Sequence, residues 1–550
     1  MNTPRPTSHS EPKTPWLPWM TLAVFWALAV SLQWLNGAYQ SDLGAHSDEP
    51  AHVVTGLMVR DYVAGPLWRG DSPVAFAKDY YERFPKVALG HYPPAFYVLE
   101  ALWLLPCRTL PMVLAFCALV TAVTAWLMFR VGKALLGQEI AVALAVAFIL
   151  YRVVQTYTAT VMADVMLTGT CLGAAMAWER FLTTRRGWWS LAFGGIAAAA
   201  ILTKASGILL ALLPVFSIAL RRDWKLVYDK RLWLAPLPVA ALAVPWMIAT
   251  VKISSEGHTG LSVTSYFLKA VSFYSGQTIE VFGWATTALL ITGAVMLGRK
   301  IVLRRSPESL ETTLWSLLLA AFVLILLVPV GFEDRYLLPA LPPAILLGAH
   351  SARNLWSSLS NLPLPRTGWQ HWATGAILFL LLVGTRLNAP DKRITGYSQV
   401  IDELALQTES TGRVIRILAC SDTHGEGALV AAAALRTPKD ISVQRGSKLL
   451  STSDWMGRGY KLAFDSPESL HQLLLESDSQ FAVLDGVVPE ERKFLHQRKV
   501  EEFVNLPGLS MSAVNDFSAR RRDRTGSLRL FRITAERNSK PSPASTLDGS

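Results

Sequence analysis

Cysteine is scarce in this chain, which has only four in its 550 residues. They stand at Cys107, Cys117, Cys171 and Cys420, and their spacing fits neither a metal-binding motif nor a disulfide framework. Three of the four lie in apolar segments, so we expect the cysteines to pack in the protein interior rather than to take part in chemistry.

Charged residues are also few. They make up 17% of the chain against 51% hydrophobic residues, and the mean hydropathy is +0.31, which is high for a soluble enzyme. The apolar residues gather in runs long enough to cross about 30 Å of hydrocarbon. We predict about eleven such spans, at residues 17–36, 109–130, 139–158, 163–182, 188–203, 206–221, 232–251, 281–298, 313–331, 336–352 and 370–387. No cleavage site follows the first run, so we expect it to remain as an anchor.

Acidic residues are outnumbered, since 41 Asp and Glu stand against 52 Lys and Arg, giving a formal charge of +11. The excess collects in short segments between the predicted spans, at residues 130–133, 180–186, 221–231, 299–305 and 353–366. With the N-terminus inside, all of them face the cytoplasm, as the positive-inside rule expects. The charge therefore reflects membrane topology, and we expect no nucleic-acid partner.

The same topology places three segments outside: the first loop at residues 37–106, the segment 252–280 and the tail. The tail alternates short apolar strands at 414–418 and 481–484 with helices at 427–436 and 467–476, a pattern typical of a small α/β domain. The predicted organisation is thus a disordered cytoplasmic N-terminus at 1–14, a transmembrane domain at 15–388, an extracytoplasmic α/β domain at 389–537 and a disordered tail at 538–550.

An acid pair, Asp48 and Glu49, follows the first span. Two adjacent carboxylates are costly to keep near lipid, so the pair predicts a functional site. The alternative is structural: Asp48 caps a helix and Glu49 interacts favourably with the helix dipole. Apolar residues at Val53, Leu57 and Met58 have helical spacing and predict an amphipathic segment on the membrane surface.

Further polar residues fall on the side of the membrane where Asp48 lies. His91 and Tyr92 precede two prolines that fix the backbone. The predicted spans end or begin at four others, namely Asp164, Lys204, Glu333 and Arg335. Cations at this depth suit a phosphate, and carboxylates suit an acceptor hydroxyl or a metal. The alternative is snorkelling or local ion pairing, for example of Glu333 with Arg335.

Two metal hypotheses arise from histidines. His91, Glu256 and His258 would suit zinc if the segment 252–280 folded over the site, although a solvated loop is the simpler interpretation. Ser421-Asp422-Thr423-His424-Gly425 resembles the first metal-site block of metallophosphoesterases, but the later Gly-Asp and Gly-Asn-His blocks are missing. We therefore expect Asp422 or Ser421 to cap a helix.

Five short motifs stand in the chain in this order: the acid pair, His-Tyr-Pro-Pro at 91–94, Ala-Asp-Val-Met-Leu at 163–167, Leu-Thr-Lys-Ala-Ser-Gly at 202–207 and Arg-Tyr-Leu-Leu-Pro at 335–339. In this order they resemble the GT-C glycosyltransferase superfamily. The likeness is to bacterial relatives of protein O-mannosyltransferases and of aminoarabinose (lipid A) transferases, over roughly residues 15–390. It implies a multi-pass enzyme of the inner cell membrane. Such an enzyme passes a hexosyl or pentosyl unit from a polyprenyl phosphate to a protein, lipid or glycan acceptor outside.

The resemblance also implies roles for residues. Asp48, with Glu49 beside it, would be the catalytic base of an inverting displacement. Arg335 and Lys204 would stabilise the leaving phosphate. His91 would hydrogen-bond the phosphate or hold a cation, although aminoarabinose transferases commonly have Lys there. Tyr92, Asp164 and Glu333 complete the expected substrate site. The resemblance implies no particular cofactor, and a divalent metal ion remains an open alternative.

Two other functions remain open. A transporter or flippase for a lipid-linked substrate would also have many spans and buried charges, but such proteins usually show inverted repeats and polar groups near the bilayer midplane. A non-catalytic relative acting in binding or assembly is the other alternative, against which the intact Asp48 speaks.

Overall fold

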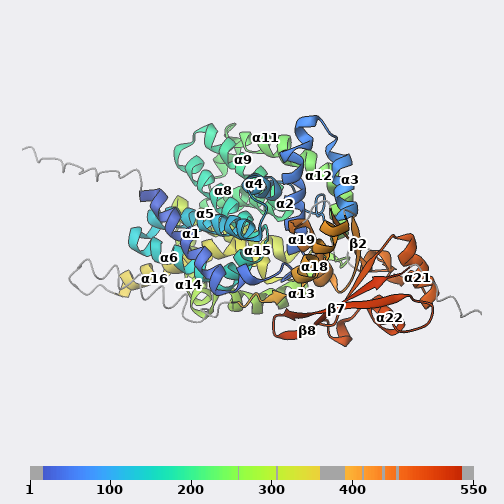
Figure 1. The fold of residues 1–550 in the computed structure, drawn as a ribbon. Coiled ribbons are helices and arrows are strands. Elements are labelled where there is room, and N and C mark those ends of the chain that lie inside the picture. The colour runs from blue at the N-terminus through green and yellow to red at the C-terminus, as the bar shows by residue number, and fades with distance from the viewer. Residues whose placement is uncertain are drawn as a thin grey trace, which may run out of the picture.

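The computed structural model describes residues 17–257, 259–304, 307–359, 390–411, 414–436, 440–453 and 457–534. A bundle of helices comes first in the chain, and a domain built on a sheet comes last and packs against one end of the bundle (Figure 1). The helices of the first part are α1 (Leu17–Leu35), α2 (Glu49–Ala64), α3 (Pro73–Arg83), α4 (Ala95–Leu104), α5 (Leu110–Leu136), α6 (Gln138–Leu150), α7 (Arg152–Ala159), α8 (Asp164–Thr184), α9 (Gly187–Thr203), α10 (Leu212–Arg221), α11 (Pro236–Pro238), α12 (Val244–Ser254), α13 (Val263–Phe282), α14 (Trp284–Val302), α15 (Ser309–Leu327) and α16 (Leu341–Leu359).

Several of these helices are long and apolar enough to cross a membrane. Within the described residues four qualify, at Leu110–Leu136, Leu232–Gly257, Trp284–Val302 and Ser309–Leu327, and α6 with α7 makes a fifth, bent by 59°. Each predicted span before residue 353 coincides with helix, and the last, at 370–387, lies outside the described residues. The protein is thus helical with at least four candidate spans, and the number eleven stays a prediction. The segment 252–280, expected as a loop, contains α13.

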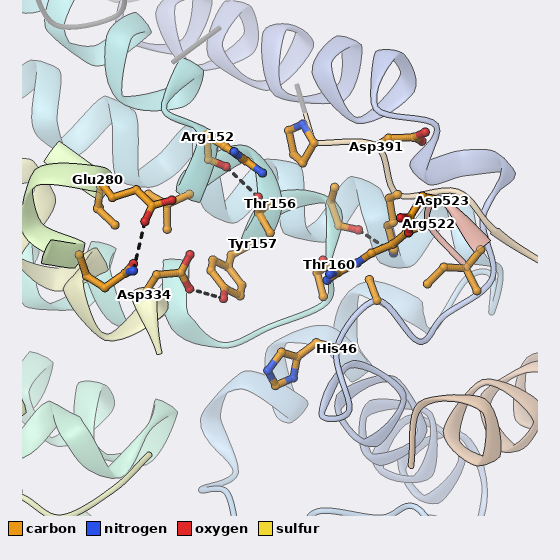
Figure 2. A pocket seen from close by; sticks show the side chains of 18 of the residues that line it. His46, Arg152, Thr156, Tyr157, Thr160, Glu280, Asp334, Asp391, Arg522 and Asp523 are labelled. Carbon is orange, nitrogen blue, oxygen red and sulfur yellow. Dashed lines mark hydrogen bonds between the residues drawn. The ribbon is translucent and has the colours of Figure 1, made fainter. Parts of the chain in front are cut away.

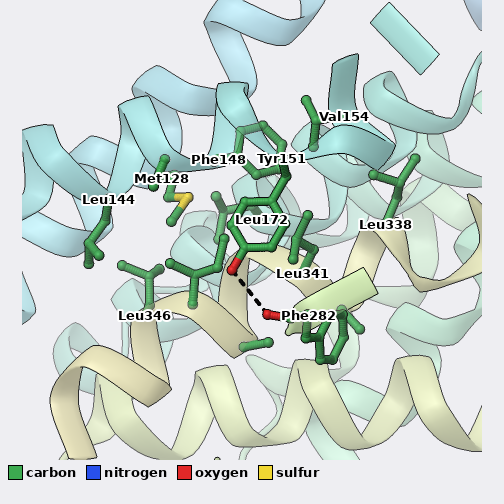
Figure 3. Packing of buried hydrophobic residues seen from close by; sticks show 14 of the residues in the cluster. Met128, Leu144, Phe148, Tyr151, Val154, Leu172, Phe282, Leu338, Leu341 and Leu346 are labelled. Carbon is green, nitrogen blue, oxygen red and sulfur yellow. Dashed lines mark hydrogen bonds between the residues drawn. The ribbon is translucent and has the colours of Figure 1, made fainter. Parts of the chain in front are cut away.

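The bend between α6 and α7 lies at Tyr151, which is buried in the helical core. Its hydroxyl donates to the carbonyl of Phe282 at 3.2 Å and so joins this bend to the end of α13 (Figure 3). Leu338 and Leu341 pack in the same core. They anchor a short 3₁₀ helix, Asp334–Ala340, that leads into α16 and carries Arg335. Apolar packing therefore fixes the position of this arginine.

Helix α2 lies inside the protein rather than on a membrane surface. Every residue from Glu49 to Met58 is buried, because α2 packs between α4 and the C-terminal helix α19 (Thr423–Arg436). The expectation of a surface-lying amphipathic segment was therefore wrong. The approach to α19 is close: a Cβ on Gly427 would lie 2.8 Å from Cγ of Pro50, so only glycine fits there.

The C-terminal domain is built on a mixed six-stranded sheet with the order β1-β7-β8-β6-β2-β3. Strands β2, β3 and β6 are parallel, and the others pair antiparallel. Its elements are β1 (Ile394–Thr395), α18 (Tyr397–Thr411), β2 (Ile415–Cys420), α19, β3 (Ile441–Arg445), α20 (Gly446–Leu449), β4 (Ser451–Thr452), β5 (Lys461–Leu462), α21 (Pro467–Glu476), β6 (Phe481–Asp485), α22 (Leu495–Phe503), β7 (Met511–Arg521) and β8 (Arg524–Ile533).

The predicted strands and helices of this domain are confirmed as β2, β6, α19 and α21. Asp422 caps α19, since its Oδ1 accepts the backbone N–H groups of His424 and Gly425 at 3.1 and 3.0 Å. The long hairpin β7–β8 was not predicted, because β7 is mostly exposed and carries few apolar residues. Both termini predicted to be disordered fall largely outside the described residues.

Candidate active site

Asp48 stands immediately before α2, yet its side chain makes no capping hydrogen bond. Its Oδ2 instead accepts the hydroxyl of Tyr92 at 2.8 Å and Nη2 of Arg335 at 3.1 Å. Tyr92 comes from the first loop, residues 37–106, and Arg335 from the 3₁₀ helix before α16, 287 residues from Asp48 in sequence. The structural alternative, in which Asp48 merely caps a helix, does not describe this side chain.

His46 and Glu333 close a ring with Asp48 and Arg335. His46 Nδ1 accepts the backbone N–H of Asp48 at 3.1 Å, so its Nε2 carries the proton and donates to Glu333 at 3.1 Å. Glu333 in turn accepts Nη2 of Arg335 at 2.9 Å. The ring leaves the Asp48 side chain 16% exposed while Arg335 is 3% exposed. The carboxylate is therefore held rigidly at the edge of the protein interior.

A second pair lies behind this ring. Lys204, which follows α9, donates to Asp164 at 2.5 Å, and Asp164 Oδ2 lies 3.9 Å from Nη1 of Arg335. The ring of Tyr336 faces both cations, 4.9 Å from Nζ of Lys204 and 5.4 Å from Cζ of Arg335. The ion pairs thus join two cations to three carboxylates, Asp48, Asp164 and Glu333. The acids of this network therefore exceed its cations by one charge.

The protonation of Asp48 follows from these neighbours. Burial alone would raise the pKa of its carboxyl, but the charge of Arg335, together with the hydrogen bond from Tyr92, outweighs burial and holds the pKa below its ordinary value. Asp48 is therefore an ionised carboxylate at neutral pH. His52 lies next to Tyr92, with 4.8 Å between the centres of the two rings. Burial lowers the pKa of His52 to about 4. His52 is thus neutral at neutral pH.

Glu49 points into a different environment from that of Asp48. It is fully buried, and its two oxygens accept the backbone N–H groups of Gly44, Ala45 and Val161. Its remaining partner is Lys392, 2.5 Å away, in the segment that leads into the C-terminal domain. Glu49 therefore ties the loop before α2 to the turn before α8 and to the segment that leads into the C-terminal domain.

Two cavities lie near Asp48, one touching its ring at His46 and the other beside α2, the helix that Asp48 precedes. The larger, of 590 Å³, lies between α7, α13 and the β7–β8 turn and is lined by charged side chains of both signs, with His46 at one side (Figure 2). Tyr157 and Asp334, hydrogen-bonded at 2.7 Å, also face it. The smaller, of 430 Å³, is lined by Ala51 of α2 and by His91. Both are large enough to hold part of a substrate.

The structure thus joins Tyr92, Asp164, Lys204, Glu333 and Arg335 to Asp48, as the sequence suggested. His91 is half-buried in the smaller cavity together with Glu256, whereas His258 lies outside the described residues. In the part of the chain that the structure describes, no three His, Cys, Asp or Glu side chains are arranged to hold a metal ion.

Sequence analysis missed His46 and Lys392. His46 stands two residues before Asp48, so its position in the sequence could have suggested that it contacts Asp48. Nothing in the sequence links Lys392 to Glu49, 343 residues earlier.

Part of the helical bundle resembles a known protein family. Residues 91–249 match the family model described as dolichyl-phosphate-mannose-protein mannosyltransferase. No curated protein matches the chain in sequence.

Solved structures share the fold. ArnT from Cupriavidus metallidurans superposes in its apo state with a TM-score of 0.56 and 14% identity, over 94% of this chain and 98% of ArnT. The same protein bound to undecaprenyl phosphate gives 0.54 and 15%, with the same coverage. The apo oligosaccharyltransferase of Archaeoglobus fulgidus gives 0.54 and 10%, over 86% of this chain and 70% of that one. The chain therefore shares the fold of these glycosyltransferase structures, and its residues 91–249 match the dolichyl-phosphate-mannose-protein mannosyltransferase family model.

Proposed function

We propose that this protein is a membrane glycosyltransferase that moves a sugar from a polyprenyl phosphate to a hydroxyl-bearing acceptor at the outer face of the inner membrane. The observation that carries the proposal is the ionised Asp48 carboxylate, which Arg335 and Tyr92 hold in place. One nearby cavity is lined by His46 of the same ring, and the other by Ala51 of α2. The ArnT structure with undecaprenyl phosphate supports the choice of a polyprenyl phosphate donor.

In the proposed reaction Asp48 takes the proton of the acceptor hydroxyl while that oxygen attacks the anomeric carbon of the sugar. The bond between sugar and phosphate breaks, and the carrier leaves as a polyprenyl phosphate with the bonding electron pair. The configuration at the anomeric carbon inverts. General-base assistance of this kind contributes about 100- to 10,000-fold to a rate.

Charge balance gives Arg335 a role in the same step. Before reaction, three carboxylates exceed the two cations of the network by one negative charge. Proton uptake by Asp48 removes this excess just as the leaving phosphate gains a negative charge. Arg335 and Lys204 are then the cations assigned to stabilise that phosphate.

We assign Glu49 a positioning role rather than contact with substrate. Its oxygens are occupied by three backbone N–H groups and by Lys392, and two of these N–H groups belong to the loop that ends at Asp48. Glu49 therefore fixes the loop from which Asp48 projects.

The test is Asp48→Asn, which keeps the shape of the side chain and removes the base. Glycans and lipids of the cell envelope would be compared by mass spectrometry in a strain without the protein and in strains restored with the wild type, with Asp48→Asn or with the control Asp79→Asn. Asp79 is an exposed acid of the same outer loop. We expect a sugar modification that is lost with the protein and falls by at least about 100-fold in Asp48→Asn.

Full modification in the Asp48→Asn strain would refute the catalytic role. If the deletion nevertheless abolished the modification, transport of a lipid-linked substrate would be the better explanation. An Asp48→Asn protein that has lost activity must be present in the membrane at the level of the wild type.

A further inference from the structure

The smaller cavity collects positive charge from two distant parts of the chain. Lys86 comes from the first outer loop, whereas Arg445 and Lys448 come from the end of β3 and from α20 in the C-terminal domain. Among its lining residues the one acidic side chain is Glu256, which is exposed to solvent. The cavity is therefore a basic pocket at the junction of the helical and C-terminal parts.

Lys86 is the unusual member of this pocket. The residue is 9% exposed, and no hydrogen bond or ion pair of its ammonium occurs among the residues that the structure describes. A largely buried ammonium without a protein partner is costly, because the group loses part of its hydration and can donate three hydrogen bonds. Burial and the nearby charge of Arg445 accordingly lower the pKa of Lys86 to about 8.

The acid that could have paired with Lys86 is occupied elsewhere. Glu426, in the first turns of α19, accepts Nε of Arg445 at 2.8 Å. It also accepts the backbone N–H and the hydroxyl of Ser447, both at 2.6 Å. These contacts position Arg445 at the cavity wall and leave Lys86 without a carboxylate partner in the described structure.

We propose that Lys86, Arg445 and Lys448 form a subsite for an anionic group, a phosphate or a carboxylate, of one of the transferase substrates. The proposal rests on the proposed function. Ala51, which lines the same cavity, lies three residues beyond Asp48 in α2, a rise of about 4.5 Å along a helix. One substrate can therefore occupy the subsite and reach the base. The C-terminal domain is, on this account, part of the substrate site.

The anion has two chemically similar sources. It is either the phosphate of the lipid carrier or an acidic group on the acceptor. Two probes separate them: inorganic pyrophosphate, which tests the subsite alone, and farnesyl phosphate, which adds a short polyprenyl chain. Binding of both would be measured by titration calorimetry on the purified full-length protein in detergent.

We expect pyrophosphate to bind the wild type and to bind Lys86→Met at least 10-fold more weakly, while Lys78→Met, an exposed lysine of α3, stays unchanged. Lys86→Arg should retain most of the affinity, because it keeps the charge. Lys448→Met, at an exposed position, should also weaken binding and cannot be dismissed as a folding defect. Absence of pyrophosphate binding, or equal binding by the wild type, Lys86→Met and Lys448→Met, would overturn the proposal.

Competition then identifies the source. If farnesyl phosphate displaces pyrophosphate and farnesol does not, the subsite holds the carrier phosphate; if farnesyl phosphate binds alongside pyrophosphate, the subsite holds an acidic group of the acceptor. Asp48→Asn should bind pyrophosphate normally. Failure of the subsite and failure of the catalytic proposal are therefore distinguishable, because the first is read from binding and the second from transfer.

Discussion

The pair Glu49–Lys392 offers a quantitative test of how the active-site loop is held. Lys392→Met removes the cation and leaves the Glu49 carboxylate buried with only backbone N–H partners. The two side chains are 0% and 4% exposed and lie 2.5 Å apart, so neither gains solvent when the other is lost. Breaking a buried pair in this way costs about 3–5 kcal/mol of the free energy of unfolding. The carbonyl of Ala159 also loses its 2.7 Å donor.

The measurement is equilibrium unfolding in denaturant, followed by tryptophan fluorescence of the detergent-purified protein. Arg416→Met is the matched control, since Arg416 pairs with Asp478 on the surface, with side chains 45% and 66% exposed. We expect this control to cost less than about 1 kcal/mol. The double variant Glu49→Gln/Lys392→Met should be less destabilised than the sum of its single variants, because no unpaired charge remains.

A Lys392→Met protein as stable as Arg416→Met would refute the reasoning. So would additive losses in the double variant. Transfer activity gives a second readout: it should fall in Lys392→Met even where the protein remains folded, because the loop that carries Asp48 loses an anchor.

Three further outcomes are expected. Because the pKa of Asp48 is lowered, its carboxylate stays ionised below the ordinary carboxyl range; the activity lost to its protonation should therefore appear only in strong acid, and Arg335→Gln should move this loss to higher pH in a pH–rate profile. The pKa of Lys86 is lowered to about 8, so pyrophosphate binding should weaken as pH rises through about 8. Calorimetry at pH 7 and 9 measures this change, and equal affinity at the two pH values would contradict it. Cys420 is buried, so the side of the membrane on which the C-terminal domain lies is best tested with Ser512→Cys, at an exposed position on β7. An impermeant thiol reagent should label this new cysteine in intact spheroplasts. Failure to label it would contradict the predicted topology.

Much of the site could be predicted because its charged side chains stand next to apolar segments, where burying a charge is energetically costly. Asp164, Lys204 and Arg335 are charges at the ends of apolar runs, where only partners or substrate make them tolerable. Their common side of the membrane follows from counting spans. The resulting set lies together in the structure, joined through the contacts of Arg335 and Asp164.

The remainder depended on tertiary contacts that leave no local pattern. Glu49 has the same sequence signal as Asp48, yet its side chain turns toward Lys392. Helix α2 has apolar residues at the spacing of a helix that lies on a membrane surface, but in the structure α19 packs against it. The proposed anion subsite could not be predicted for the same reason, since only folding brings Arg445 and Lys448 of the C-terminal domain to the cavity that Lys86 lines.

The close contact of α2 with α19 has a consequence for biosynthesis. Pro50 leaves the ribosome long before Gly427, against which it packs in the finished protein. At a synthesis rate of about 5–20 residues per second, the intervening chain takes roughly 20–80 s to make. For most of that time Asp48 exists without Arg335, and for all of it without a complete α19. On the proposed function, a nascent chain thus carries the base without its partners, and sugar transfer has to wait until the C-terminal domain has been made.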